Sequence, residues 1–145
     1  MDQKDPRKNW RKALFGIDAA IYALALATPV LDYSVFGGEE QTVYGFGALV
    51  MTVGWPEILC NLGNVALWAG WFAYLYRQPV LALVCAALAL TGPMLAPQLT
   101  GTPVNELGPA FYLWAAAMGF FCFIALWEFV IEAKAERSGN LDPSP

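Results

Sequence analysis

A few charged side chains within long apolar stretches are the residues of this chain that could do chemistry. Asp18 and Glu128 interrupt two such stretches, and Arg77 lies between two more. A carboxylate inside a membrane is costly and usually faces a bundle interior, a water-filled cavity or a cation. Helical spacing places Asp18 and Glu128 at similar shallow depths, with Arg77 beside that layer. The three residues form a candidate intramembrane charge cluster. It would bind a proton or cation, or be purely structural, and the shallow depth favours the structural interpretation.

A second candidate is a stripe of amide and indole side chains that recur at spacings of three and four residues, which places them on one face of a helix. The residues of this stripe are Asn61, Asn64, Trp68 and Trp71. Amide groups in lipid need hydrogen-bond partners, so we expect the stripe to face another helix rather than acyl chains. A packed polar seam between helices is the simpler interpretation, and a groove for a lipid, quinone or substrate is the alternative.

The composition excludes several kinds of active site. The chain has no histidine, which removes imidazole ligands for haem and for most zinc sites, and also removes His-assisted nucleophiles. Its three cysteines, Cys60, Cys85 and Cys122, are far apart with no C-x-x-C pair, and the sequence contains no glycine-rich phosphate loop. We therefore expect no enzymatic activity, no catalytic residues, no cofactor and no metal site.

The overall composition is typical of a membrane protein. Hydrophobic residues make up 58% of the 145 residues and charged residues only 14%, whereas soluble domains contain about 25% charged residues. Four apolar stretches of roughly bilayer-spanning length predict an all-α membrane protein with one domain over residues 1–145. The first stretch has features of a signal peptide, but Asp18 interrupts it, so we expect an uncleaved anchor. The transmembrane helices are expected at residues 13–31, 58–76, 79–97 and 110–131.

The distribution of charge predicts the orientation of these helices. All eight basic residues lie in the tails, residues 1–12 and 132–145, or at Arg77 in the short connection between the second and third helices. The connections on the other side carry only acidic charges. The positive-inside rule then places both termini in the cytoplasm, with residues 32–57 as an external loop.

Residues 42–54, within the external loop, are apolar but few for a span. A fifth helix here would invert the rest of the chain and place Arg77 outside, against the positive-inside rule. We therefore expect a short interfacial or re-entrant segment between the first two transmembrane helices.

In the external loop, acidic and aromatic side chains are interspersed along the sequence. This combination is common at surfaces that recognise other proteins. Acidic loops are equally what remains once basic residues are excluded from the external side. The candidate partner surface consists of Tyr33, Phe36, Glu39, Glu40, Tyr44 and Trp55.

The Asn and Trp seam, together with the segment 108–114 that opens the fourth apolar stretch, carries a resemblance to a known group. The chain resembles small four-helix bacterial inner-membrane proteins, and the likeness covers the last three transmembrane helices. The resemblance implies the architecture only and supplies no catalytic or binding residues.

These observations predict a small polytopic membrane protein without enzymatic activity. The leading hypothesis is an accessory or immunity-type protein that binds another protein through its helices and its external loop. The alternative is a small oligomeric transporter that couples a proton or cation to Asp18 and Glu128. The expected partners are the lipid bilayer and either a protein partner or further copies of the chain. We expect no nucleic-acid partner, because the basic N-terminus adjoins a membrane helix and is typical of an orientation signal.

Overall fold

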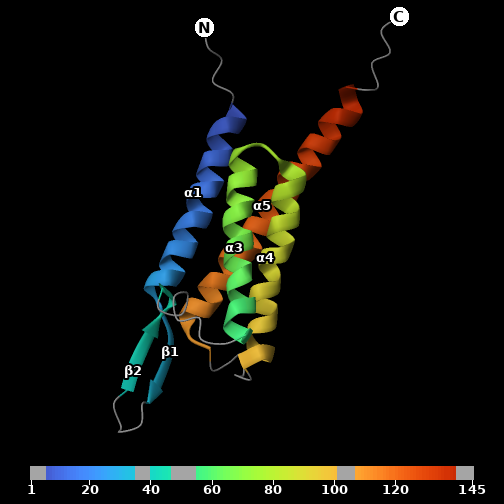
Figure 1. Cartoon of the computed structure of the whole chain (residues 1–145). Coiled ribbons are helices and arrows are strands. Elements are labelled where there is room, and N and C mark those ends of the chain that lie inside the picture. The colour runs from blue at the N-terminus through green and yellow to red at the C-terminus, as the bar shows by residue number, and fades with distance from the viewer. Residues whose placement is uncertain (1–5, 35–39, 47–54, 101–106, 140–145) are drawn as a thin grey trace, which may run out of the picture.

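The structure is a computed structural model that describes residues 6–34, 40–46, 55–100 and 107–139. Its described part contains four helices and one pair of strands (Figure 1). The four helices confirm the predicted helical architecture, and two of them, α4 and α5, are long and apolar enough to cross a membrane. The elements are α1 (Pro6–Ala27), β1 (Pro29–Ser34), β2 (Glu40–Tyr44), α3 (Trp55–Leu75), α4 (Pro79–Thr100) and α5 (Pro109–Gly139).

Proline marks where three of the helices begin. Pro6, Pro79 and Pro109 are the first residues of α1, α4 and α5. Proline suits this position because the first backbone N–H groups of a helix have no partner within the helix, and because its φ angle is already helical. The observed starts of α4 and α5 agree with the expected residues 79 and 110 to within one residue, whereas α1 begins seven residues before the expected residue 13.

The turn between α3 and α4 is a tight helix cap. The backbone N–H of Arg77 donates to the carbonyl of Tyr74 at 3.1 Å, and that of Gln78 donates to the carbonyl of Ala73 at 2.9 Å. This pair of bonds defines a Schellman motif, whose central residue adopts a left-handed conformation and is usually glycine. Here that residue is Arg77, with a φ of 58°. The cap makes α3 and α4 an antiparallel hairpin.

Consecutive helices run in opposite directions (Figure 1). The N-terminal end of α1, the turn between α3 and α4, and the C-terminal end of α5 lie at one end of the bundle, and the strand pair projects from the other. α4 packs against both α3 and α5, and α5 also packs against α1. The helices α1 and α3 are joined mainly by large side chains rather than by close backbone contact.

Small residues allow α3 and α4 to approach closely. Ala82, Ala86 and Ala89 form a buried stripe on α4. A Cβ atom added to Gly63 of α3 would lie 3.0 Å from the carbonyl oxygen of Ala89 and 3.2 Å from the Cα of Gly92. Such backbone-to-backbone contact is how apolar helices associate in lipid, where no hydrophobic force drives them together. The α3–α4 hairpin is therefore the most tightly packed part of the bundle.

The segment after α1 differs from the sequence prediction. The first helix ends at Ala27 instead of residue 31, and β1 and β2 form an antiparallel pair in which Asp32 is opposite Thr42. The expected interfacial or re-entrant segment thus begins as a strand up to Tyr44, and residues 47–54 lie outside the described part of the chain.

Proline explains why α1 ends early. Pro29 lacks a backbone N–H and disfavours helical geometry at Thr28, the residue before it. The carbonyl of Thr28 instead accepts a hydrogen bond from the backbone N–H of Gly45 at 2.9 Å, which closes the base of the strand pair. Gly45 lies so close to α1 that an added Cβ atom would be 2.2 Å from the carbonyl oxygen of Ala25. The strand pair is therefore fastened to the end of α1.

We expect Gly63→Ala to lower the free energy of unfolding by about 1–3 kcal/mol, because the added methyl group would press against the backbone of α4. The matched control is Gly119→Ala on α5, where an added Cβ atom meets nothing within 4 Å. The control should be neutral or gain up to about 1 kcal/mol from the higher helix propensity of alanine. Reversible unfolding in mixed detergent micelles measures both, and equal stabilities would contradict the close α3–α4 contact.

Candidate functional site

Asp18 is fully buried in the middle of α1, with 0% of its surface exposed. Its Oδ2 atom accepts a hydrogen bond from the indole N–H of Trp71 on α3 at 2.7 Å. Its Oδ1 atom has no hydrogen-bond partner among the residues that the structure describes. The ring of Trp71 lies edge-on to Phe15 and to Tyr22, at centroid distances of 5.6 and 5.4 Å. The carboxyl group is thus enclosed by aromatic rings and keeps one oxygen available for a proton, a water molecule or another donor.

Asn64 of α3 joins three helices through its side-chain amide. Its Oδ1 atom accepts hydrogen bonds from the hydroxyl of Tyr22 on α1 at 3.0 Å and from the indole N–H of Trp114 on α5 at 2.7 Å. Its Nδ2 atom donates to Oδ1 of Asn61 at 3.0 Å. A carbonyl oxygen can accept two hydrogen bonds, so this arrangement uses both lone pairs. Asn64 therefore acts as the polar centre of the bundle.

The structure places the predicted seam of Asn61, Asn64, Trp68 and Trp71 between α3 and its neighbours α1 and α5. Trp68 lies at the margin of the seam, with 38% of its surface exposed, and its ring contacts Tyr22 edge-on at 6.4 Å. Tyr22 and Trp114 complete the network, and the sequence analysis did not include them among its site residues. Tyr22 lies one helical turn from Asp18, which was the signal available for it. Nothing in the sequence indicated that Trp114 meets Asn64.

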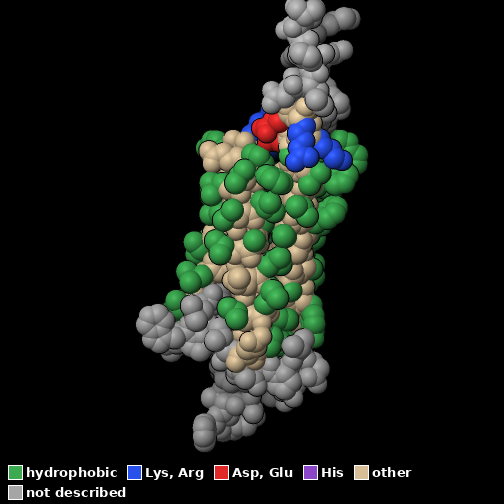
Figure 2. Space-filling model, turned by 90° about the vertical axis from the view of Figure 1, so that its right-hand side faces the viewer, with side chains coloured by type: hydrophobic (Ala, Val, Ile, Leu, Met, Phe, Trp, Pro, Cys, Tyr) green, Lys and Arg blue, Asp and Glu red, His purple; other side chains and the backbone are tan. Residues whose placement is uncertain are grey.

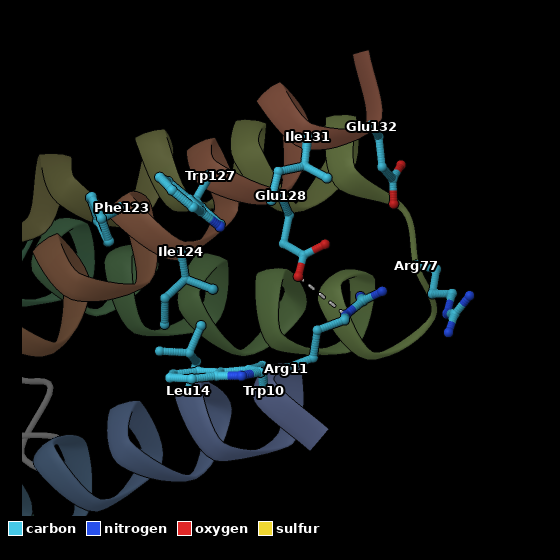
Figure 3. A pocket seen from close by; sticks show the side chains of 10 residues that line it. All are labelled: Trp10, Arg11, Leu14, Arg77, Phe123, Ile124, Trp127, Glu128, Ile131 and Glu132. Carbon is cyan, nitrogen blue, oxygen red and sulfur yellow. Dashed lines mark ion pairs between the residues drawn. The ribbon is translucent and has the colours of Figure 1, made fainter. Parts of the chain in front are cut away.

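The charged end of the bundle centres on Arg11 of α1. Its Nε atom lies 3.6 Å from Oε1 of Glu128 on α5 (Figure 3). Its guanidinium carbon lies 4.7 Å from the ring centroid of Tyr74, and the group also donates to the backbone carbonyl of Tyr74. The hydroxyl of Tyr74 donates in return to the carbonyl of Arg11 at 3.5 Å. Arg11 thereby links α1 to both α3 and α5.

The structure brings together only part of the predicted cluster of Asp18, Arg77 and Glu128. Arg77 and Glu128 line one cavity at the charged end of the bundle, and Asp18 is not part of its lining. Glu128 pairs with Arg11. Asp18 lies seven residues beyond Arg11 on α1, which is about 10 Å along the helix axis. Arg77 lies at the α3–α4 turn and is exposed. The sequence analysis grouped these residues by depth, but depth alone did not identify Arg11 as the partner of Glu128.

The predicted partner surface lies largely outside the described residues. Phe36 and Glu39 fall in a segment that the structure does not describe, and only the backbone is described for Tyr33, Glu40 and Trp55. Tyr44, at the end of β2, has 52% of its surface exposed, and the nearby Phe46 has 62%. Two aromatic side chains are therefore exposed at the base of the strand pair.

Metal binding finds no support among the side chains that the structure describes. They contain no group of three or more His, Cys, Asp or Glu residues that could hold an ion. The free thiols of Cys85 and Cys122 are buried and half-buried. In the described interior, hydrogen bonds hold the helices together. Asp18 also has one carboxyl oxygen without a hydrogen-bond partner there.

We expect Asn64→Ala to destabilise the bundle by about 1–3 kcal/mol, because it leaves the donors of Tyr22 and Trp114 without their acceptor. Trp114→Phe keeps the ring and removes only the N–H donor. It should cost less in the Asn64→Ala background than alone, by about 0.6 kcal/mol, the usual coupling of polar groups between membrane helices. Unfolding of the four proteins in micelles measures the coupling, with Leu62→Ala as an exposed control. Purely additive effects would show that the amide does not hold α5.

Comparison of the chain with protein-family models, with characterised proteins and with solved structures finds no match. The likeness to small four-helix inner-membrane proteins therefore stays a prediction from the sequence. The function has to be argued from the geometry of the bundle, its two ends and its apolar surface.

Proposed function

We propose that the chain is a four-span membrane protein with both termini in the cytoplasm of a bacterium. The helices α1, α3 and α4 contain 22, 21 and 22 residues, so each is about 32 Å long, close to the thickness of the hydrocarbon core. Exposed apolar side chains cover all four helices, and examples from α1, α3, α4 and α5 are Leu24, Phe72, Val84 and Phe123. A surface of this kind is stable in lipid and would be a liability in water.

The position of the basic side chains supports the proposed orientation. Basic residues gather at one end of the helical column, above a long apolar surface (Figure 2). They come from the start of α1, from the α3–α4 turn and from the end of α5. The connections at the opposite end contain no Lys or Arg. This asymmetry is the signature of the positive-inside rule.

Single cysteines in a background without Cys60, Cys85 and Cys122 test this topology. A thiol introduced by Glu40→Cys should react with a membrane-impermeant maleimide in intact cells. A thiol introduced by Lys134→Cys should react only after the membrane is permeabilised, because it lies on the cytoplasmic side. Leu88→Cys, on the apolar surface of α4, is the lipid-protected control. Labelling at position 134 in intact cells would contradict the proposed orientation.

Within the membrane, we propose that the protein is a non-enzymatic accessory or immunity-type subunit that binds another protein. The observation that carries this proposal is the strand pair β1–β2, which projects beyond the helices (Figure 1). In the part of the chain that the structure describes, no third strand pairs with β1 or β2. A pair of strands is only marginally stable alone, and its outer edges carry backbone groups that can pair with a strand of a partner. The exposed Tyr44 and Phe46 add aromatic contact area beside those edges.

The bundle interior favours a binding role over a catalytic one. The amide of Asn64 and the indoles of Trp71 and Trp114 are engaged in hydrogen bonds between helices. Groups that already satisfy one another hold a structure together and have little capacity left for a substrate. Recognition is then left to the outer surface, where the strand pair projects beyond the ends of the helices (Figure 1).

We expect the double variant Tyr44→Ala and Phe46→Ala to lose a stoichiometric protein partner that the wild-type chain retains. The chain is extracted from its native membrane into nanodiscs, and the mass of the intact assembly is measured. Charge reversal of Glu39 and Glu40 should weaken the same association, because it inverts the field of the loop. Phe72→Ala, which removes an exposed ring from α3, is the matched control and should keep the partner.

Retention of the partner by both loop variants would exclude the strand pair as the contact surface. A pure homo-oligomer would favour the alternative, a small cation- or proton-coupled transporter. The unpartnered Oδ1 atom of Asp18 is the observation that favours this alternative. Loss of ion flux in Asp18→Asn and Glu128→Gln, with the fold intact, would then be the decisive result.

A further inference from the structure

A cavity of about 770 Å³ lies between α1 and α5 near the charged end of the bundle. Its apolar wall consists of Leu14 from α1 and of Phe123, Ile124, Trp127 and Ile131 from α5 (Figure 3). The last turns of α5 extend beyond the other helices and lean away from α1 (Figure 1). The cavity therefore opens where the two helices diverge, and its apolar wall continues along α5 toward the middle of that helix.

Four charged side chains also line this cavity, two of each sign. Arg11 and Glu128 lie opposite each other as an ion pair. Arg77 and Glu132 are the other two, and in the part of the chain that the structure describes neither takes part in an ion pair. In Figure 3 both lie toward the charged end, while Phe123 and Ile124 lie farther from that end, near the middle of α5. The cavity thus has a charged mouth and an apolar far end.

The backbone at Arg77 gives a second reason to regard this side chain as functional. Its φ of 58° lies in the left-handed region, which glycine adopts far more easily than arginine. Glycine would occupy this position with less backbone strain. The presence of arginine instead is a reason to look for a function of its side chain. Here that side chain is a guanidinium group at the mouth of the cavity.

We propose that the cavity binds one phospholipid with a zwitterionic headgroup that carries a primary amine, of the phosphatidylethanolamine class. The phosphate would contact Arg77, the ammonium group would contact Glu132, and an acyl chain would lie along Leu14 and Phe123. This inference rests on the proposed membrane topology, which brings the cavity to the level of the cytoplasmic headgroups. The exposed Trp10 and Trp127 also line it, and tryptophan is enriched at that level of a membrane.

The balance of charge selects this headgroup over an anionic one. The formal charges of the lining residues cancel, since two arginines face two glutamates. An anionic headgroup would meet Glu128 and Glu132 without a balancing positive charge of its own, whereas an aminophosphate headgroup offers one group of each sign. A primary ammonium group can also donate hydrogen bonds to a carboxylate, which a quaternary amine cannot do.

Native mass spectrometry of the purified full chain tests this inference. The chain is stripped of lipid in a mild detergent and titrated with equal amounts of phosphatidylethanolamine, phosphatidylglycerol and phosphatidylcholine. We expect one phosphatidylethanolamine molecule per chain to be retained in preference to the other two. Arg77→Gly and Glu132→Gln should each weaken its retention about three- to fivefold, the range for an exposed charge contact.

The variants separate a lost lipid contact from a lost fold. Glycine suits the left-handed backbone at position 77, so Arg77→Gly should keep or raise the unfolding midpoint while it weakens lipid retention. Arg77→Lys restores a positive charge and should recover part of the retention. Glu136→Gln, one turn farther along α5 and outside the cavity lining, is the matched control and should behave as the wild type.

Three results would overturn the proposed lipid site. They are a preference for phosphatidylglycerol or phosphatidylcholine, no retained lipid at all, and retention in Arg77→Gly and Glu132→Gln that equals that of the wild type. The thiol-labelling experiment does not depend on this site. If labelling agrees with the proposed topology but no lipid binds, only the lipid site is contradicted. If position 134 is labelled in intact cells, the membrane topology on which the site rests is contradicted.

Discussion

Asp18 and Asn64 place polar groups inside an otherwise apolar bundle, where an unpartnered hydrogen-bonding group is expensive. This constraint governs how α1 joins the other helices. The partners come from different helices, Trp71 of α3 for Asp18, and Tyr22 of α1 with Trp114 of α5 for Asn64. If α1 turned about its axis or slid along α3, it would break both contacts together. Hydrogen bonds, which are directional, therefore set the register of α1.

The bundle consequently uses two different kinds of packing. The α3–α4 pair relies on Gly63 and the small residues of α4, so that the two backbones nearly touch. The α1–α3 pair stands farther apart and is filled by large side chains such as Tyr22 and Trp71, whose rings meet edge-on at 5.4 Å. Close packing of small residues favours rigid association, whereas a layer of large polar aromatics favours one specific alignment. Together the two interfaces align α1, α3 and α4, and α5 packs against both α1 and α4.

The helices could be predicted from the sequence because their signals are local. Long apolar stretches predicted four helices, and the structure contains them. α1 ends early because of Pro29, which disfavours helical geometry at the residue before it. This signal is also local, but the prediction followed the apolar run to Leu31 instead. The strand pair depends on contact between residues 29–34 and 40–44, which an apolar run cannot reveal.

The site was less predictable because its contacts are made between helices. The spacing of Asn61, Asn64, Trp68 and Trp71 indicated that they share a face, but it carried no information on which partner each would meet. The partner of Glu128 could not be predicted for the same reason. Arg11 and Arg77 flank the same end of the bundle in the sequence pattern, and only the arrangement of α1 beside α5 brings Arg11 to within 3.6 Å of Glu128.

That pairing leads to a distinction between the two arginines. Arg11 contacts Glu128 and Tyr74, so its charge is engaged in holding three helices together. Arg77 supplies the basic charge of the α3–α4 connection and adopts a backbone conformation that favours glycine. A basic residue that served only to orient the helices could equally stand at Gln78, where no left-handed backbone is required, because the positive-inside rule depends on the number of charges and not on their exact position. A positive charge at the strained position, on the rim of the α1–α5 cavity, instead fits the proposed lipid site.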